Sequence, residues 1–155
     1  MTARDWLESI RADVVELREL EYQVLEVETK LGPHGQRMGS IGGAGDPDKM
    51  RPVDRLMDSG LREKLEAQKA KVDRRVEHAT RVLYGESGRG GVAGARGYLD
   101  ADILCAYYLQ GEEWPEIASM LASFNPARPN GWCRQRAMRA LEFIERTGRD
   151  VLANS

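Results

Sequence analysis

The chain has 155 residues, of which 41% are hydrophobic and 31% charged, and its formal net charge is −2 at pH 7. No apolar run approaches the roughly 20 residues that span a bilayer, and no apolar stretch of a signal peptide follows the N-terminus. We therefore expect a cytoplasmic protein that does not enter a membrane. The slight acidity argues against a protein that coats nucleic acid by charge alone.

The first half of the sequence predicts two long amphipathic helices. In residues 4–31 the apolar positions recur at steps of three and four, which keeps them on one helix face, and Gly32-Pro33 ends this helix. A second helix lies within 53–84, after a loop at 32–52 that is rich in glycine and proline. Residues 1–84 are therefore expected to form an antiparallel hairpin. Its narrow apolar stripe leaves open that the hairpin self-associates, as a coiled coil within a homodimer.

A second glycine-rich stretch, 85–97, is interpreted as a linker to a C-terminal unit at 98–149. Charge is segregated within this unit. Residues 98–125 contain five acids and no Lys or Arg, whereas 126–155 contain six arginines and three acids. The acid-rich part cannot touch DNA, and we expect it to meet a basic protein surface. The arginine-rich part matches the last helix of a helix-turn-helix DNA reader.

The final helix is predicted to begin near Asn130, a plausible N-cap. A projection at 100° per residue places its small and apolar residues on one side: Cys133, Ala137, Ala140, Leu141 and Ile144. The opposite arc holds Arg134, Gln135, Met138 and Arg139, with Arg136 on the flank. Arginine can read guanine and glutamine can read adenine in the major groove. We expect those four side chains to face the groove, and Arg128 and Arg136 to contact phosphates. Charge alone leaves open that these arginines only solvate an amphipathic helix.

Signals of catalysis or of bound cofactors are missing from the sequence. His34, His78, Cys105 and Cys133 lack partners at metal-ligand spacing. The glycine loop at 88–93 follows a charged helix rather than a strand, which does not fit a dinucleotide site. No combination of nucleophile, base and orienting group is recognisable. We expect a protein that is not an enzyme and has no cofactor and no metal.

The stretch Ala-Tyr-Tyr-Leu-Gln-Gly-Glu-Glu-Trp-Pro-Glu-Ile-Ala, residues 106–118, and the later Arg-Ala-Met-Arg-Ala-Leu-Glu-Phe-Ile, residues 136–144, resemble the helix-turn-helix of sigma-factor region four. The pattern is most similar to small phage regulators of the ArpU/RinA type. The resemblance implies a phage or prophage transcription regulator that binds double-stranded DNA, at a promoter with RNA polymerase. Two features depart from the family pattern: the long glycine-rich stretch at 85–97 and the long turn at 123–130.

The fold expected from the sequence is all-α, with a long N-terminal helical hairpin and a C-terminal trihelical helix-turn-helix unit. The function expected is DNA-binding transcription regulation. Two alternatives stay open. One is a phage DNA-packaging protein similar to a terminase small subunit. The other is a helical protein-interaction module that does not bind DNA and exposes an apolar stripe on its first helix.

Overall fold

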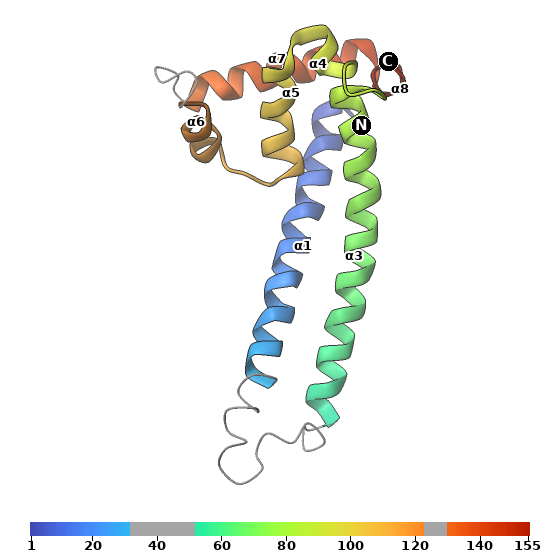
Figure 1. Ribbon diagram of the computed structural model, residues 1–155, viewed down its shortest axis with the longest axis vertical. Coiled ribbons are helices and arrows are strands. Elements are labelled where there is room, and N and C mark those ends of the chain that lie inside the picture. The colour runs from blue at the N-terminus through green and yellow to red at the C-terminus, as the bar shows by residue number, and fades with distance from the viewer. Residues whose placement is uncertain (32–51, 123–129) are drawn as a thin grey trace. The chain divides into compact units, whose positions relative to one another are not determined.

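A computed structural model describes residues 1–31, 52–122 and 130–155, and within these ranges it consists of helices and turns without a strand (Figure 1). The all-α fold class is confirmed. Two long helices come first and shorter ones follow. Their bounds are α1 (Ala3–Leu31), α3 (Pro52–Tyr84), α4 (Gly91–Arg96), α5 (Tyr98–Leu104), the π-helix η2 (Cys105–Leu109), α6 (Trp114–Ala122), α7 (Asn130–Thr147) and α8 (Arg149–Ala153).

The chain divides into two compact units. Unit 1 comprises Met1–Val14 and Val72–Ser155, and unit 2 comprises Val15–Lys71. Helices α1 and α3 each contribute to both units. The packing therefore differs from the predicted division at residue 84, because the first turns of α1 and the last turns of α3 belong with the C-terminal helices.

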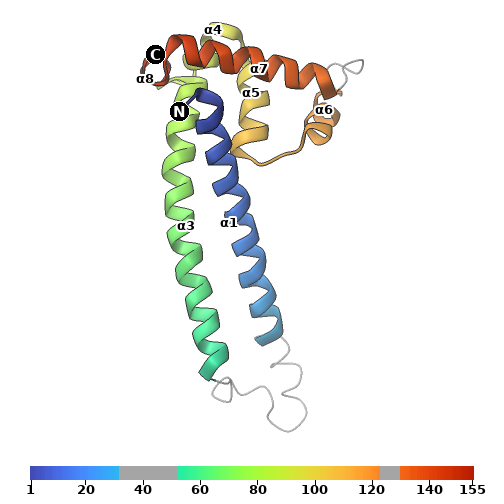
Figure 2. The same ribbon diagram turned by 180° about the vertical axis from the view of Figure 1, so that it is seen from behind.

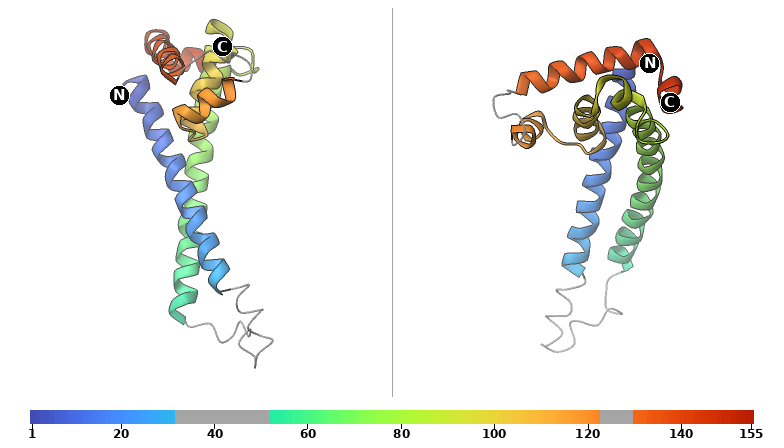
Figure 3. Two further views of the ribbon diagram at one scale, coloured as in Figure 1. Left: turned by 90° about the vertical axis from the view of Figure 1, so that its left-hand side faces the viewer. Right: turned by 45° about the horizontal axis from the view of Figure 1, so that its top comes forward.

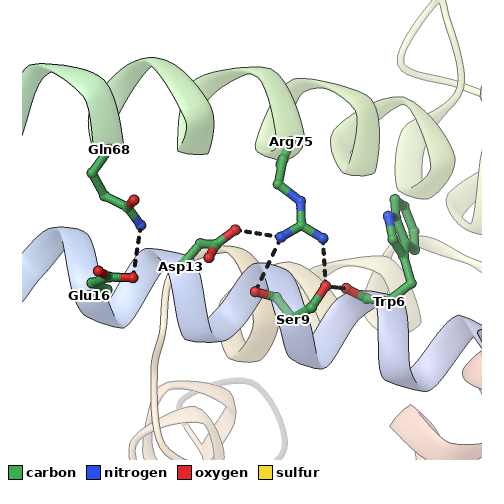
Figure 4. A network of polar contacts seen from close by, with 6 residues as sticks. All are labelled: Trp6, Ser9, Asp13, Glu16, Gln68 and Arg75. Atoms are coloured by element: carbon green, nitrogen blue, oxygen red, sulfur yellow. Dashed lines mark hydrogen bonds and ion pairs between the residues drawn. The ribbon is translucent and has the colours of Figure 1, made fainter.

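Within unit 2, side-chain contacts show that α1 and α3 are antiparallel. Gln68 donates from Nε2 to Glu16 Oε2 at 3.4 Å (Figure 4), and Arg62 forms an ion pair with Glu28. As the residue number rises along one helix, it falls along the other, as the hairpin prediction requires. Val24 is buried between these contacts. Because the polar contacts are exposed, burial of the apolar stripe contributes more to this pairing than they do.

The same antiparallel pairing continues in unit 1 around Arg75. Its guanidinium lies between the Ser9 hydroxyl and the Asp13 carboxylate (Figure 4). The Ser9 hydroxyl also donates to the Trp6 carbonyl at 2.6 Å. The Trp6 ring meets the His78 ring edge-on, with centroids 5.5 Å apart. These contacts fix the register of α1 on α3 at the end of the hairpin that joins the C-terminal helices.

The segment 85–97, predicted as a linker, is instead a packed part of unit 1 that contains α4. Gly91 has a φ of +61°, and a Cβ added to it would lie 2.4 Å from the Val82 carbonyl oxygen. A Cβ on Gly90 would lie 2.6 Å from the carbonyl oxygen of Ser155. The Ser155 hydroxyl in turn accepts a hydrogen bond from the Gly91 amide at 2.6 Å. These glycines permit close approach of backbones, which is the opposite of the flexible role that their composition suggested.

Helices α5, α6 and α7 form the predicted trihelical unit. Helix α7 contacts both α5 and α6. Figures 2 and 3 show α7 lying across the start of α5, with α6 beside the first turns of α7. Gly111 has a φ of +70° after η2, and Pro115 lies in the first turn of α6, where its missing N–H costs nothing. The core of this unit is made of fully buried aliphatic side chains, among them Ile103, Leu104, Ile117 and Ile144.

Candidate nucleic-acid interface

Helix α7 has one buried side and one exposed side, as the sequence predicts. The predicted inner residues are all buried: Cys133, Ala137, Ala140, Leu141 and Ile144. Their small average size lets α5 and α6 approach the axis of α7 closely. The packing therefore fixes the rotation of α7 about its axis, and this rotation decides which side chains reach solvent.

The predicted groove-facing side chains all lie on the exposed side of α7. Arg134, Gln135 and Arg139 are exposed, and Met138 has 41% of its surface accessible. Two guanidinium groups, one amide and one thioether thus lie on one face of α7, over a length of about two helical turns. Such an arc can offer paired donors to a phosphate or to a guanine edge, an amide to adenine, and apolar contact to a thymine methyl.

Arg136 is engaged within the protein, which differs from the phosphate contact predicted for it. Its Nε donates to Asp100 Oδ1 at 2.6 Å, and its guanidinium carbon lies 5.3 Å from the centroid of the Trp132 ring. Its side chain is 32% exposed. Arg136 therefore ties α7 to α5. The sixth predicted site residue, Arg128, lies outside the described residues.

Asp100 is the structural centre of this region. It is fully buried, and its second oxygen, Oδ2, accepts a hydrogen bond from Arg96 Nε at 2.8 Å. One carboxylate thus joins α4, α5 and α7 through two arginines. A buried carboxylate requires such partners, because desolvating an unpaired charge costs several kcal/mol. Asp100 is therefore not part of the acidic surface that was expected over 98–125.

The sequence contains a signal for the buried role of Asp100. Asp100 lies four residues after Arg96, the spacing of an ion pair within a helix. It also lies three and four residues before Ile103 and Leu104, on the side of α5 that becomes buried. An acid at a core position of a helix indicates a buried partner, yet nothing in the spacing identifies Arg136 as the second one.

The Gly-Glu-Glu-Trp motif, residues 111–114, ends in the first residue of α6 and contacts Arg11 of α1. The Arg11 guanidinium lies 3.9 Å from the centroid of the Tyr107 ring, and Trp114 stacks on the same ring at 4.1 Å with 13° between the planes. Arg11 also donates to the Glu112 carbonyl at 2.9 Å and to the Glu113 carboxylate at 2.8 Å. The motif that carries the family resemblance therefore has a structural role here, which is to attach α1 to the turn that positions α6.

Two tyrosines and both cysteines near this region have pKa values that favour their neutral forms. Burial raises the pKa of Tyr108 to about 12. Burial, together with the hydrogen bond from its hydroxyl to Asp102 at 2.6 Å, also raises the pKa of Tyr84. The pKa values of the Cys105 and Cys133 thiols are raised by burial as well. Protonated thiols are poor nucleophiles and poor metal ligands.

The described residues contain neither a metal-binding cluster nor a helix that could span a membrane. In the ranges 1–31, 52–122 and 130–155, no three or more His, Cys, Asp or Glu side chains are grouped so that they could hold a metal ion. Within the same ranges, no helix combines the length and the apolar character that crossing a membrane demands. Comparison of the chain with protein-family models, with curated proteins and with solved structures finds no match.

Proposed function

We propose that the protein binds double-stranded DNA through the exposed side of the first half of α7, and that it acts as a transcription regulator of phage or prophage type. One observation carries the DNA-binding proposal: Arg134, Gln135, Met138 and Arg139 are exposed together on a helix whose opposite side is fully packed. A rigidly held helix with such an arc has the properties of a recognition helix. The regulatory role rests on the resemblance to sigma region-four-like regulators.

The distribution of acids restricts the interface to the first half of α7. Residues 130–141 contain three arginines and no Asp or Glu, whereas Glu142 and Glu145 follow. Glu145 accepts a hydrogen bond from the Ala3 amide at 2.6 Å. Acids also occupy the start of α6, where Glu113 pairs with Arg11. Negative charge there opposes the affinity for phosphate that a helix N-terminus otherwise has.

Within this interface we assign different roles to the side chains. Arg134 and Arg139 supply the two charges that contact phosphate or guanine, and Gln135 and Met138 supply base contacts. Arg136 is a positioning residue that holds α7 on α5 through Asp100. This replaces the phosphate contact expected for Arg136 from the sequence.

The test is a titration of a fluorescently labelled duplex of mixed sequence, monitored by anisotropy over a range of salt concentrations. Substituting Arg134→Ala and Arg139→Ala together is expected to weaken binding at least tenfold and to reduce the salt slope by roughly two. Arg74→Ala with Arg89→Ala is the matched control, because it removes the same charge from two exposed positions outside α7.

Absence of binding at low salt would refute the proposal, because phosphate contacts strengthen as salt falls. Equal losses in the two double variants would indicate attraction by net charge alone. The number of subunits, measured by light scattering, separates the regulator from the packaging alternative. A monomer or dimer favours a regulator that acts with RNA polymerase, and a ring of many subunits favours packaging.

A further inference from the structure

The outer side of α1 in unit 2 carries a second apolar row that does not face α3. Tyr22 is 69% exposed, Leu25 59% and Val15 37%. At 100° per residue, Tyr22 lies about 160° and Val15 about 180° from the buried Val24. A shallow hollow of about 320 Å³ lies beside Val15 and Tyr22. Single exposed apolar residues are ordinary, whereas a row of them on one helix face indicates a contact surface.

The spacing of this row fits a helical partner. Val15, Arg18, Tyr22 and Leu25 follow one another at steps of three, four and three residues. These are the a and d positions of a coiled-coil seam. A tyrosine at the centre of the row suits an interface, because its ring covers a large area at a small cost in entropy.

The charges that flank the row define the partner. Glu19 and Glu26 lie along one edge, at positions equivalent to e, and Glu21 lies along the other edge, at a position equivalent to g. Glu28, the next residue at position g, is paired with Arg62 of α3. The same helix of a second copy would place glutamates against glutamates, which is unfavourable. A helix with lysine or arginine at its flanking positions would face Glu19 and Glu26 along one edge and Glu21 along the other.

We infer that this outer face of α1, defined by Val15, Tyr22 and Leu25 with their flanking glutamates, is a docking surface for a basic amphipathic helix of another protein. The row from Val15 to Leu25 is about 15 Å long at 1.5 Å per residue, so the interface is small. Small interfaces of this kind belong to transient complexes. The surface belongs to unit 2 alone and is independent of the proposed DNA contact on α7.

The experiment uses the full chain and two synthetic helical peptides of about 25 residues, a length at which helices are stable enough to test. Both peptides have leucine at the a and d positions. One has lysine at e and g, and the other has glutamate there. Binding is measured by isothermal titration calorimetry, and circular dichroism verifies that each protein variant is folded. We expect saturable binding of the lysine peptide and no binding of the glutamate peptide.

Two double variants test the surface. Tyr22→Ser with Leu25→Ser should weaken binding of the lysine peptide at least tenfold, because aromatic residues at the centre of an interface dominate its affinity. Glu19→Lys with Glu26→Lys should weaken binding of the lysine peptide at least tenfold, because its lysines then face lysines along one of the two edges. Ala67→Ser with Ala70→Ser alters exposed positions of α3 in the same unit and should change neither affinity.

Three outcomes would overturn the inference. The first is failure of the lysine peptide to bind the unmodified chain. The second is binding that survives in the Tyr22→Ser, Leu25→Ser variant, which would indicate non-specific attraction to the acidic chain. The third is self-association in sedimentation velocity that this same variant abolishes, because the row would then be covered by a second copy.

Discussion

Replacing Asp100 by asparagine should destabilise unit 1 more than any other single isosteric change of a carboxylate. The side chain is fully buried, and its two oxygens accept hydrogen bonds from Arg136 at 2.6 Å and from Arg96 at 2.8 Å. Asparagine keeps one acceptor oxygen. Its NH2 group then faces the guanidinium of either Arg96 or Arg136, and these two donors repel each other in place of the former ion pair.

The structure sets the size of this effect. A hydrogen bond to a charged group contributes about 1.5–3 kcal/mol, and a donor left unsatisfied costs about as much again. The side chains of Arg96 and Arg136 are 28% and 32% exposed, so water compensates part of the loss. We therefore expect Asp100→Asn to lower the free energy of unfolding by about 2–3 kcal/mol. Its effect should remain below that of a fully enclosed pair.

Urea unfolding monitored by tryptophan fluorescence measures this quantity well. All three tryptophans of the chain, Trp6, Trp114 and Trp132, lie in unit 1. The control is Asp102→Asn, which alters an exposed carboxylate that accepts one hydrogen bond from Tyr84 and should cost less than about 1 kcal/mol. If the free energies of unfolding of the two variants lie within about 0.5 kcal/mol of each other at an unchanged m value, the two buried ion pairs of Asp100 do not stabilise unit 1 as proposed.

Two further predictions concern the backbone and alkaline pH. Gly91→Ala should lower the free energy of unfolding by more than about 2 kcal/mol, because the methyl group would meet a backbone carbonyl at a positive φ. Gly60 lies within α3, and a Cβ added to it would meet nothing, so Gly60→Ala should raise the free energy of unfolding by about 0.5–1 kcal/mol. Thermal unfolding of both variants, followed by circular dichroism, checks that the two effects have opposite signs. The raised pKa of Tyr108, about 12 against an ordinary 10.0, should give stability that is complete below pH 10 and is lost as pH rises from 10 to 12. Urea midpoints at pH 8 and pH 11 should therefore differ less in Tyr108→Phe than in the unmodified chain, and equal differences would contradict the assignment.

Much of the helical architecture was predictable because it depends on local signals. The period of the apolar residues gave both long helices, and the glycine after each periodic run marked its end. The projection of α7 separated its buried residues from its exposed ones without error. A helix has a fixed rotation per residue, so the sequence alone determines which side chains share a face.

The roles of individual polar and glycine residues were not predictable in the same way. Arg136 looked like a phosphate contact because its partner, Asp100, lies 36 residues away in the sequence. The glycines of 85–97 looked like a linker because composition does not reveal that Ser155 packs against Gly90 and Gly91. In both cases the deciding contact is long-range.

The sequence by itself determined the helices, their apolar faces and the segregation of charge, because these follow from the spacing of residues along one chain. Only the tertiary structure decided which charges stay exposed on α7 and which are used to hold it in place. It also decided that α1 keeps an outer apolar row after pairing with α3 within unit 2. Burial is a property of the packed unit, and the same arginine or leucine can lie in the core or at a binding surface according to what packs against it.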